Sequence, residues 1–183
     1  MDYCRFFEIF YIVYMQIAKT TVYIETTIPS LITARPSKDI TKTYRQNITK
    51  FFWENESYKY DLFISKYVLE ECGRGDVNAV KRRLELIKEI PFLDENEEVE
   101  KLAEEYFEYL NIPKKAKTDC FHLAICVIYK INYLLSWNMT HLGNPTFSKI
   151  VLYNGTHELW LPQLVTPDVF MEIQKEEVEN GRL

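Results

Sequence analysis

The sequence predicts an α/β protein, a three-layer α/β/α sandwich with a central parallel sheet. Short apolar runs rich in β-branched residues recur along the chain, as in strands buried on both faces. Segments with helical spacing of apolar residues separate these runs, and this alternation builds parallel strand–helix–strand units. A length of 183 residues fits one domain with a sizeable core.

The first strand is predicted at Thr21–Ile24, before the turn-forming pair Pro29 and Ser30. Ser37 is the expected N-cap of a helix over Asp39–Glu54. The apolar side of this helix is predicted from residues at helical spacing: Ile40, Tyr44, Ile48, Phe51 and Phe52.

A second buried strand is predicted at Tyr60–Ile64, followed by a helix from Val68 to Cys72 that Gly73 and Gly75 break or cap. The next helix is expected over Val77–Ile87. Its solvent side is predicted to carry three basic residues: Lys81, Arg82 and Arg83.

Ile90–Leu93 is predicted as a connector or edge strand, and Glu97–Leu110 as an acidic amphipathic helix that ends at Asn111–Pro113. The apolar side of that helix is predicted from six residues: Val99, Leu102, Ala103, Tyr106, Phe107 and Leu110.

The last third begins with a buried helix over Asp119–Tyr129, with Thr118 as its N-cap. A strand at Tyr133–Ser136, a helix at Thr140–Leu152 and a last strand or its exit at Leu164–Pro167 complete the predicted elements.

Residues 1–18 are predicted to form an N-terminal extension to a domain at 19–183. The apolar run Phe6–Tyr14, interrupted by Glu8, is shorter than the roughly 20 residues of a membrane-spanning helix. We expect residues 1–14 to precede the natural start, since Met15 lies just before the first strand.

The net charge of −5 and the pI of about 5.3 argue against a generally basic nucleic-acid coat protein. They leave a nuclease open, because its active-site carboxylates are themselves negative. The four cysteines show no CxxC pair or zinc spacing, which is typical of reduced thiols in a cytoplasmic protein.

Acidic or amide side chains stand where four predicted elements end or begin: Glu25, the pair Glu70–Glu71, Asp119 and Asn138. The carboxyl ends of parallel strands share one rim of the sheet, where such folds place their sites. Oxygen ligands select hard cations such as Mg²⁺ or Mn²⁺. The pattern therefore indicates a divalent-metal site, although each acid taken alone is more commonly a solvated cap.

The residues around these positions resemble the four motifs of PIN-domain nucleases, in order. VYIETTIPS at Val22–Ser30 resembles the first motif, FISKYVLEE at Phe63–Glu71 the second, DCFHLA at Asp119–Ala124 the third and YLLSWN at Tyr133–Asn138 the fourth. The resemblance runs from about Thr21 to about Phe170, and it is strongest to VapC-type toxins of type II toxin–antitoxin systems.

This resemblance implies Mg²⁺- or Mn²⁺-dependent cleavage of RNA, with Glu25, Glu71 and Asp119 as metal ligands. Glu71 is preferred because it keeps the family's distance from Ser65, and Glu70 is the alternative. Asn138 would ligate the metal weakly or orient a water. The hydroxyls expected beside the carboxylates or the attacking water belong to two residues: Thr26 and Ser136.

Two positions depart from the family pattern. Glu25 and Asn138 both stand where Asp is commoner. The amide of Asn138 removes one negative charge and cannot act as a base, so one tightly held ion is expected rather than two.

Each further candidate residue allows two interpretations. His122 is either packed beside the site or contacts phosphate, and His141 either lies on the surface or contacts RNA. Lys117, like Lys114 and Lys115, belongs to a solvated loop or holds RNA phosphates.

The sequence therefore predicts a metal-dependent endoribonuclease, toxin-like and cytoplasmic, without membrane association. A PIN-fold protein that binds RNA or a partner without cleavage is the alternative, and a phosphatase or DNA nuclease on the same acids is a third. The resemblance implies an RNA substrate, an antitoxin partner and a homodimer, for which the helix Glu97–Leu110 is the candidate face.

Overall fold

A computed structural model describes residues 19–138 and 144–180. Its centre is an all-parallel sheet of five strands in the order β3-β2-β1-β4-β5. The strands are β1 (Thr21–Ile24), β2 (Asp61–Ser65), β3 (Phe92–Leu93), β4 (Tyr133–Leu135) and β5 (Gln163–Val165).

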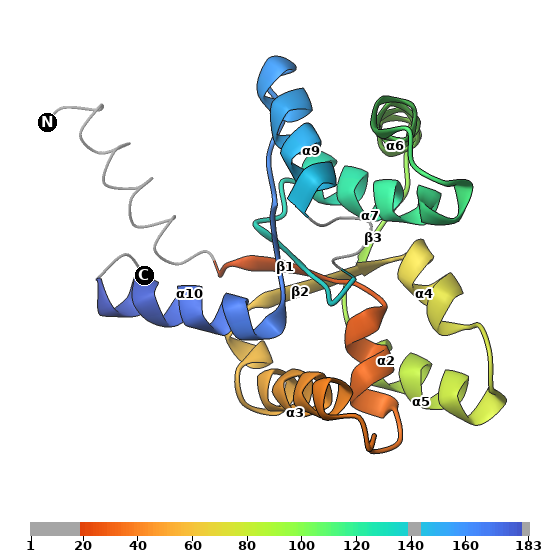
Figure 1. Ribbon diagram of the computed structural model, residues 1–183, viewed down its shortest axis with the longest axis vertical. Coiled ribbons are helices and arrows are strands. Elements are labelled where there is room, and N and C mark those ends of the chain that lie inside the picture. Colours follow the sequence, from red (N-terminus) through yellow and green to blue (C-terminus); the bar gives the residue numbers. More distant parts are fainter. Residues whose placement is uncertain (1–18, 139–143, 181–183) are drawn as a thin grey trace, which may run out of the picture.

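Helices cover both faces of the sheet, which makes the predicted three-layer α/β/α sandwich (Figure 1). One layer contains α2 (Thr27–Thr33), α3 (Ile40–Asn55) and α5 (Val77–Ile87). The other contains α6 (Glu97–Leu110), α7 (Lys117–Ile128) and α9 (Asn144–Thr156). The remaining helices are α4 (Lys66–Cys72), α10 (Pro167–Glu179) and the short 3₁₀ turns η1 (Ser57–Lys59) and η2 (Lys114–Ala116).

The chain adds its strands first on one side of β1 and then on the other. From β1 it adds β2 and then β3 on one side, and it returns to place β4 and β5 on the other. The register pairs Ile24 at the end of β1 with Leu135 at the end of β4. The carboxyl ends of these two strands therefore meet at a topological switch point, where open α/β sheets bind their ligands.

The core explains why the central strands read as continuous apolar runs. Val22, Tyr23 and Ile24 of β1 are fully buried, as are Leu134 and Leu135 of β4. Each such aliphatic side chain contributes about 1.5–3 kcal/mol to folding through burial. Helix α7 is buried on nearly all sides, as predicted from its apolar sequence.

Helix α3 corrects two sequence-based predictions. Its N-cap is Asp39, which accepts a hydrogen bond from the Lys42 backbone, whereas Ser37 lies two residues earlier and bonds the Asp39 nitrogen. The buried side consists of Gln46, Thr49 and Phe52. Three residues predicted to be on the apolar side are instead exposed: Ile40 (87%), Tyr44 (49%) and Phe51 (51%).

Other boundaries also differ. Helix α7 begins at Lys117 directly after η2, so Thr118 lies inside the helix rather than at its N-cap. Arg83 is half-buried and donates to the carbonyls of Cys72 and Arg74, in contrast to its exposed neighbours Lys81 and Arg82.

Two helices lie outside the predicted set, α2 and α10. Two prolines in the sequence indicate a turn or a strand exit: Pro29, inside α2, and Pro167, at the start of α10. Proline is, however, well tolerated in the first turn of a helix. The predicted extension at residues 1–18 and the start of the predicted helix at 140–143 lie outside the described residues.

Candidate metal centre

The candidate site lies at the switch point, where the ends of β1 and β4 meet helices α4 and α7. Glu25 directly follows β1, and its backbone nitrogen donates to the carbonyl of Leu135 at 3.1 Å. Glu71 comes from α4, which begins where β2 ends. Asp119 and His122 lie one turn apart at the start of α7.

Glu25 is only 5% exposed, and its carboxylate is held by three hydrogen-bond donors. Its Oε2 accepts hydrogen bonds from the Thr27 nitrogen (2.9 Å), the Thr27 hydroxyl (2.5 Å) and the Ser136 hydroxyl (2.9 Å). These three hydrogen bonds all go to one oxygen and fix the orientation of the carboxylate.

Glu71 is also held through one carboxylate oxygen. Its Oε2 accepts from the Thr26 hydroxyl at 2.5 Å and lies 3.3 Å from His122 Nε2. Partial burial raises the pKa of Glu71, but His122, Thr26 and Arg74 more than offset this and hold it below its ordinary value. The neighbouring Glu70 is exposed.

His122 is 1% exposed and is held at both ring nitrogens. Opposite Glu71, its Nδ1 lies 2.7 Å from the Tyr23 hydroxyl, which in turn lies 2.6 Å from the Ser65 hydroxyl. Burial lowers the pKa of His122, but the hydrogen bond with Glu71 and the charges of Glu25, Glu71 and Asp119 raise it above its ordinary value.

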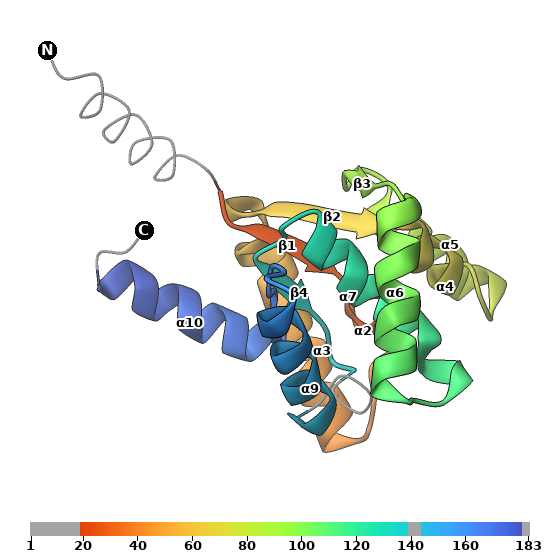
Figure 2. The ribbon, with the colours of Figure 1, turned by 90° about the horizontal axis from the view of Figure 1, so that it is seen from above.

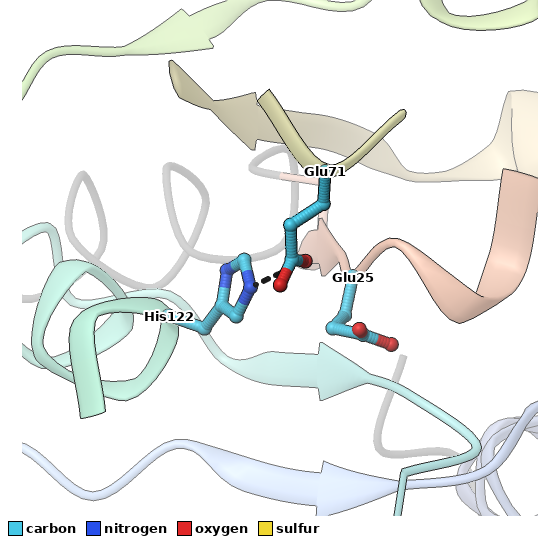
Figure 3. Close-up of side chains that lie close together, drawn as sticks. All are labelled: Glu25, Glu71 and His122. Atoms are coloured by element: carbon cyan, nitrogen blue, oxygen red, sulfur yellow. Dashed lines mark hydrogen bonds and ion pairs between the residues drawn. The ribbon is translucent and has the colours of Figure 1, made fainter. Parts of the chain in front are cut away.

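Glu71 and His122 point toward each other, and Glu25 lies beside them, from three different parts of the chain (Figure 3). Each offers one ligand atom, and these atoms lie within 4.8 Å of one another. Two carboxylate oxygens and one imidazole nitrogen at this spacing form a donor set that fits a divalent cation. The cation would also relieve the repulsion between the carboxylates.

Asp119 and Asn138 form a pair beside this group. Asn138 donates from Nδ2 to Oδ1 of Asp119 at 3.1 Å, and its backbone nitrogen donates to the Ser136 hydroxyl at 2.8 Å. Ser136 in turn donates to Glu25. Asp119, 8% exposed, is not among the three residues whose ligand atoms cluster within 4.8 Å.

The remaining candidates are placed away from the cluster or outside the described residues. Lys117 pairs with Glu104, and its ammonium lies over the rings of Phe107 and Phe121. Lys114 and Lys115 are exposed. His141 lies outside the described residues.

Tyr23, Ser65 and Thr27 were not predicted to take part in the site. Tyr23 carries a detectable signal, since it is a hydroxyl-bearing residue between aliphatic neighbours in a strand buried on both faces. A buried hydroxyl needs a hydrogen-bond partner, so a polar residue is expected next to Tyr23. Thr27 and Ser65 carry no comparable signal.

Fold and site together define an α/β protein with a carboxylate–histidine cluster at the switch point of a parallel sheet. No protein-family model matches the chain, and no curated protein matches it. Within the described residues, no helix is long and apolar enough to cross a membrane.

Among solved structures, the chain is similar to a crystal structure of VapBC2 from Rickettsia felis bound to a DNA fragment from their promoter. The match has a TM-score of 0.49 and 12% sequence identity, and it covers 80% of this chain and 98% of that chain. Because score and identity are both low, the fold assignment rests on the sheet order and the helix layers themselves.

Proposed function

We propose that this protein is a divalent-metal-dependent endoribonuclease of the PIN type and a toxin-like component of a type II toxin–antitoxin system. The observation that carries the proposal is the convergence of Glu25, Glu71 and His122 at the switch point. The order of the four sequence motifs supports the choice of RNA as substrate.

The residues present fit a divalent ion such as Mg²⁺ or Mn²⁺, held by Glu25 and Glu71 with Asp119 and Asn138 beside them. Such an ion supplies positive charge for a phosphate and lowers the pKa of a bound water. Thr27 and Ser136 fix the carboxylate of Glu25, and Thr26 fixes that of Glu71. The Asn138 amide orients Asp119 toward the same rim.

The test is cleavage of single-stranded RNA by the full chain with Mg²⁺ or Mn²⁺, with and without a chelator. We expect chelation to abolish cleavage and Asp119→Asn to reduce it by about 10- to 100-fold. Equal activity of wild type and Asp119→Asn would remove Asp119 from the mechanism. Competition among RNA, DNA and small phosphoesters separates a ribonuclease from a DNA nuclease or a phosphatase.

A binding protein without cleavage is the second candidate, and Asn138 favours it. The amide is neutral and is already hydrogen-bonded to Asp119, so the site carries one negative charge fewer than the usual PIN pattern. RNA binding without metal-dependent cleavage would support this candidate.

We further propose a cytoplasmic location and a cognate antitoxin as partner. A homodimer stays a proposal, but α6 is a poor face for it. The apolar residues of α6, among them Val99, Leu102 and Tyr106, are buried within the chain, where α6 packs against α7 and α9. Figure 2 shows α6 from the side, alongside α7.

A further inference from the structure

We propose that His122 is itself a ligand of the resident ion, through Nε2, and that the site consequently takes a first-row transition ion in preference to Mg²⁺. This inference rests on the proposed metal-dependent function and names the class of its metal. His122 is the most deeply buried member of the cluster, and Nε2 is the ring nitrogen directed at Glu71 (Figure 3).

The contacts of His122 allow either neutral tautomer. A carboxylate only accepts, so in the present arrangement Nε2–H donates to Glu71. When the ring is neutral, Nδ1 then accepts from the Tyr23 hydroxyl. If the proton sits on Nδ1 instead, Nδ1–H donates to the Tyr23 oxygen and the Tyr23 hydroxyl donates to Ser65. The lone pair of Nε2 then faces Glu71, beside Glu25 in the same cluster.

Tyr23 and Ser65 thus form the support that a ligating histidine requires. Metal-bound imidazoles generally donate their second N–H to a fixed acceptor, which sets the tautomer and the ring orientation. Tyr23 is fully buried, and burial raises its pKa well above its ordinary value, so its hydroxyl keeps its proton. Ser65, also fully buried, holds that hydroxyl in place.

The donor set decides the class of ion. Mg²⁺ is bound in proteins by oxygen ligands and water, whereas imidazole nitrogen suits transition ions. A site with two carboxylates and one imidazole therefore favours ions such as Mn²⁺, Fe²⁺ or Co²⁺ over Mg²⁺. Mn²⁺ is the useful probe because it is paramagnetic.

The test is pulsed electron paramagnetic resonance of Mn²⁺ bound to the full chain, which detects directly coordinated nitrogen. The chain has three histidines, at 122, 141 and 157. We expect a ¹⁴N coupling that changes to ¹⁵N in protein labelled with [¹⁵N]histidine and that persists in the double variant His141→Gln/His157→Gln. Bound Mn²⁺ without nitrogen coupling, or a coupling lost in the double variant, would overturn the inference.

A competition titration gives the second readout. The ratio of Mn²⁺ to Mg²⁺ affinity should fall by about 10-fold in His122→Gln. Tyr67→Phe is the matched control: its ring lies 6.2 Å from that of His122, and it should leave the ratio unchanged. An unchanged ratio in folded His122→Gln would contradict the proposal.

RNA cleavage measured on the same samples separates the two proposals. Nitrogen-coupled Mn²⁺ without cleavage would leave the ligand assignment standing and reject the nuclease. Cleavage with Mn²⁺ held by oxygen alone would reject the ligand assignment and retain the nuclease.

Discussion

The Asn138 amide donates a hydrogen bond to the Asp119 carboxylate at 3.1 Å. Asn138 is uncharged, so it supplies a hydrogen-bond donor to Asp119 but neutralises no charge. Replacing Asn138 by Asp exchanges this donor for a second carboxylate. Without metal, we expect Asn138→Asp to lower the free energy of unfolding by about 1–2 kcal/mol, since it loses a hydrogen bond and gains a repulsion. Added Mn²⁺ should recover the loss, because ion binding stabilises the folded state.

Urea denaturation with a chelator and with Mn²⁺ measures this effect. Asn138→Ala is the control, since it loses the donor without adding charge and should show less recovery. If Mn²⁺ stabilises both variants equally, Asn138 does not face the ion.

The hydroxyl of Tyr67 is buried and has no hydrogen-bond partner among the described residues. Removing an unpaired buried polar group costs little, so Tyr67→Phe should keep stability within about 0.5 kcal/mol of wild type or increase it. Tyr23→Phe loses contacts with both Ser65 and His122 and should destabilise the fold by about 2 kcal/mol. Thermal unfolding of the two variants side by side tests the contrast, which a similar loss in both would contradict.

Asp168 at the start of α10 gives a pH-dependent contribution to stability. Partial burial raises its pKa, but hydrogen bonds from the hydroxyls of Thr166 and Tyr44 more than offset this and place it below its ordinary value. The folded state therefore favours the carboxylate. Its stabilisation is fully present above the unfolded pKa of about 3.9 and is lost as pH falls through the lower folded value.

Asp168→Asn should thus destabilise the protein by about 0.5–1 kcal/mol near neutral pH, where the charge also favours the helix N-terminus. The difference from wild type should vanish in acid below the folded pKa. Urea titrations across the acid range measure it, and a difference that stays constant with pH would show that the charge plays no part.

The cysteines in the described residues should be unreactive in the folded protein. Cys72, Cys120 and Cys126 are free and buried. Burial raises the pKa of the Cys72 thiol to about 11 and of Cys120 to about 12, and that of Cys126 well above its ordinary value. Since the thiolate is the nucleophile, a Cys4→Ser variant should react with a thiol reagent near pH 8 only after denaturation. Fast labelling of the native variant would contradict this.

The sequence was most informative where burial is two-sided or a helix is strongly amphipathic. Val77–Ile87 and Glu97–Leu110 have the predicted bounds, and the central strands differ by a residue at most. In the central strands and in Glu97–Leu110 apolar spacing matches the actual packing, because most of the residues that repeat are buried. In Val77–Ile87 the match is partial, since Ile87 is buried whereas Val77 is 79% exposed.

Helix α3 shows the limit. Its inner face includes Gln46 and Thr49, whose polar atoms are paired with hydrogen-bond partners outside the apolar pattern. Its hydrophobic pattern is therefore only partly right, with Phe52 buried but Ile40, Tyr44 and Phe51 exposed.

The elements that carry the candidate site could be predicted from the sequence, but the contacts between its side chains could not. Acids at strand ends indicate the rim, because parallel strands end together. Which of them converge depends on side-chain direction, which brings His122 next to Glu71 and pairs Asp119 with Asn138. Sequence spacing does not determine such pairings, since α4 and α7 meet only in the folded chain.

Glu70 and Glu71 offer the cleanest test of the site, because they are adjacent, identical in chemistry and opposite in placement. Glu71 accepts from Thr26 and contacts His122, whereas Glu70 is exposed at the surface of α4. Glu71→Gln keeps the size of the side chain but replaces the carboxylate of a proposed metal ligand by a neutral amide. We expect it to weaken Mn²⁺ binding and RNA cleavage by about 10- to 100-fold.

Glu70→Gln changes the net charge by the same amount and should leave both quantities within about 2-fold, since exposed charges interact weakly through water. Calorimetric Mn²⁺ titration and RNA cleavage on the two variants therefore separate a ligand from a general charge effect. Equal losses in both would mean that overall acidity, and not the geometry around Glu71, determines the binding of the ion.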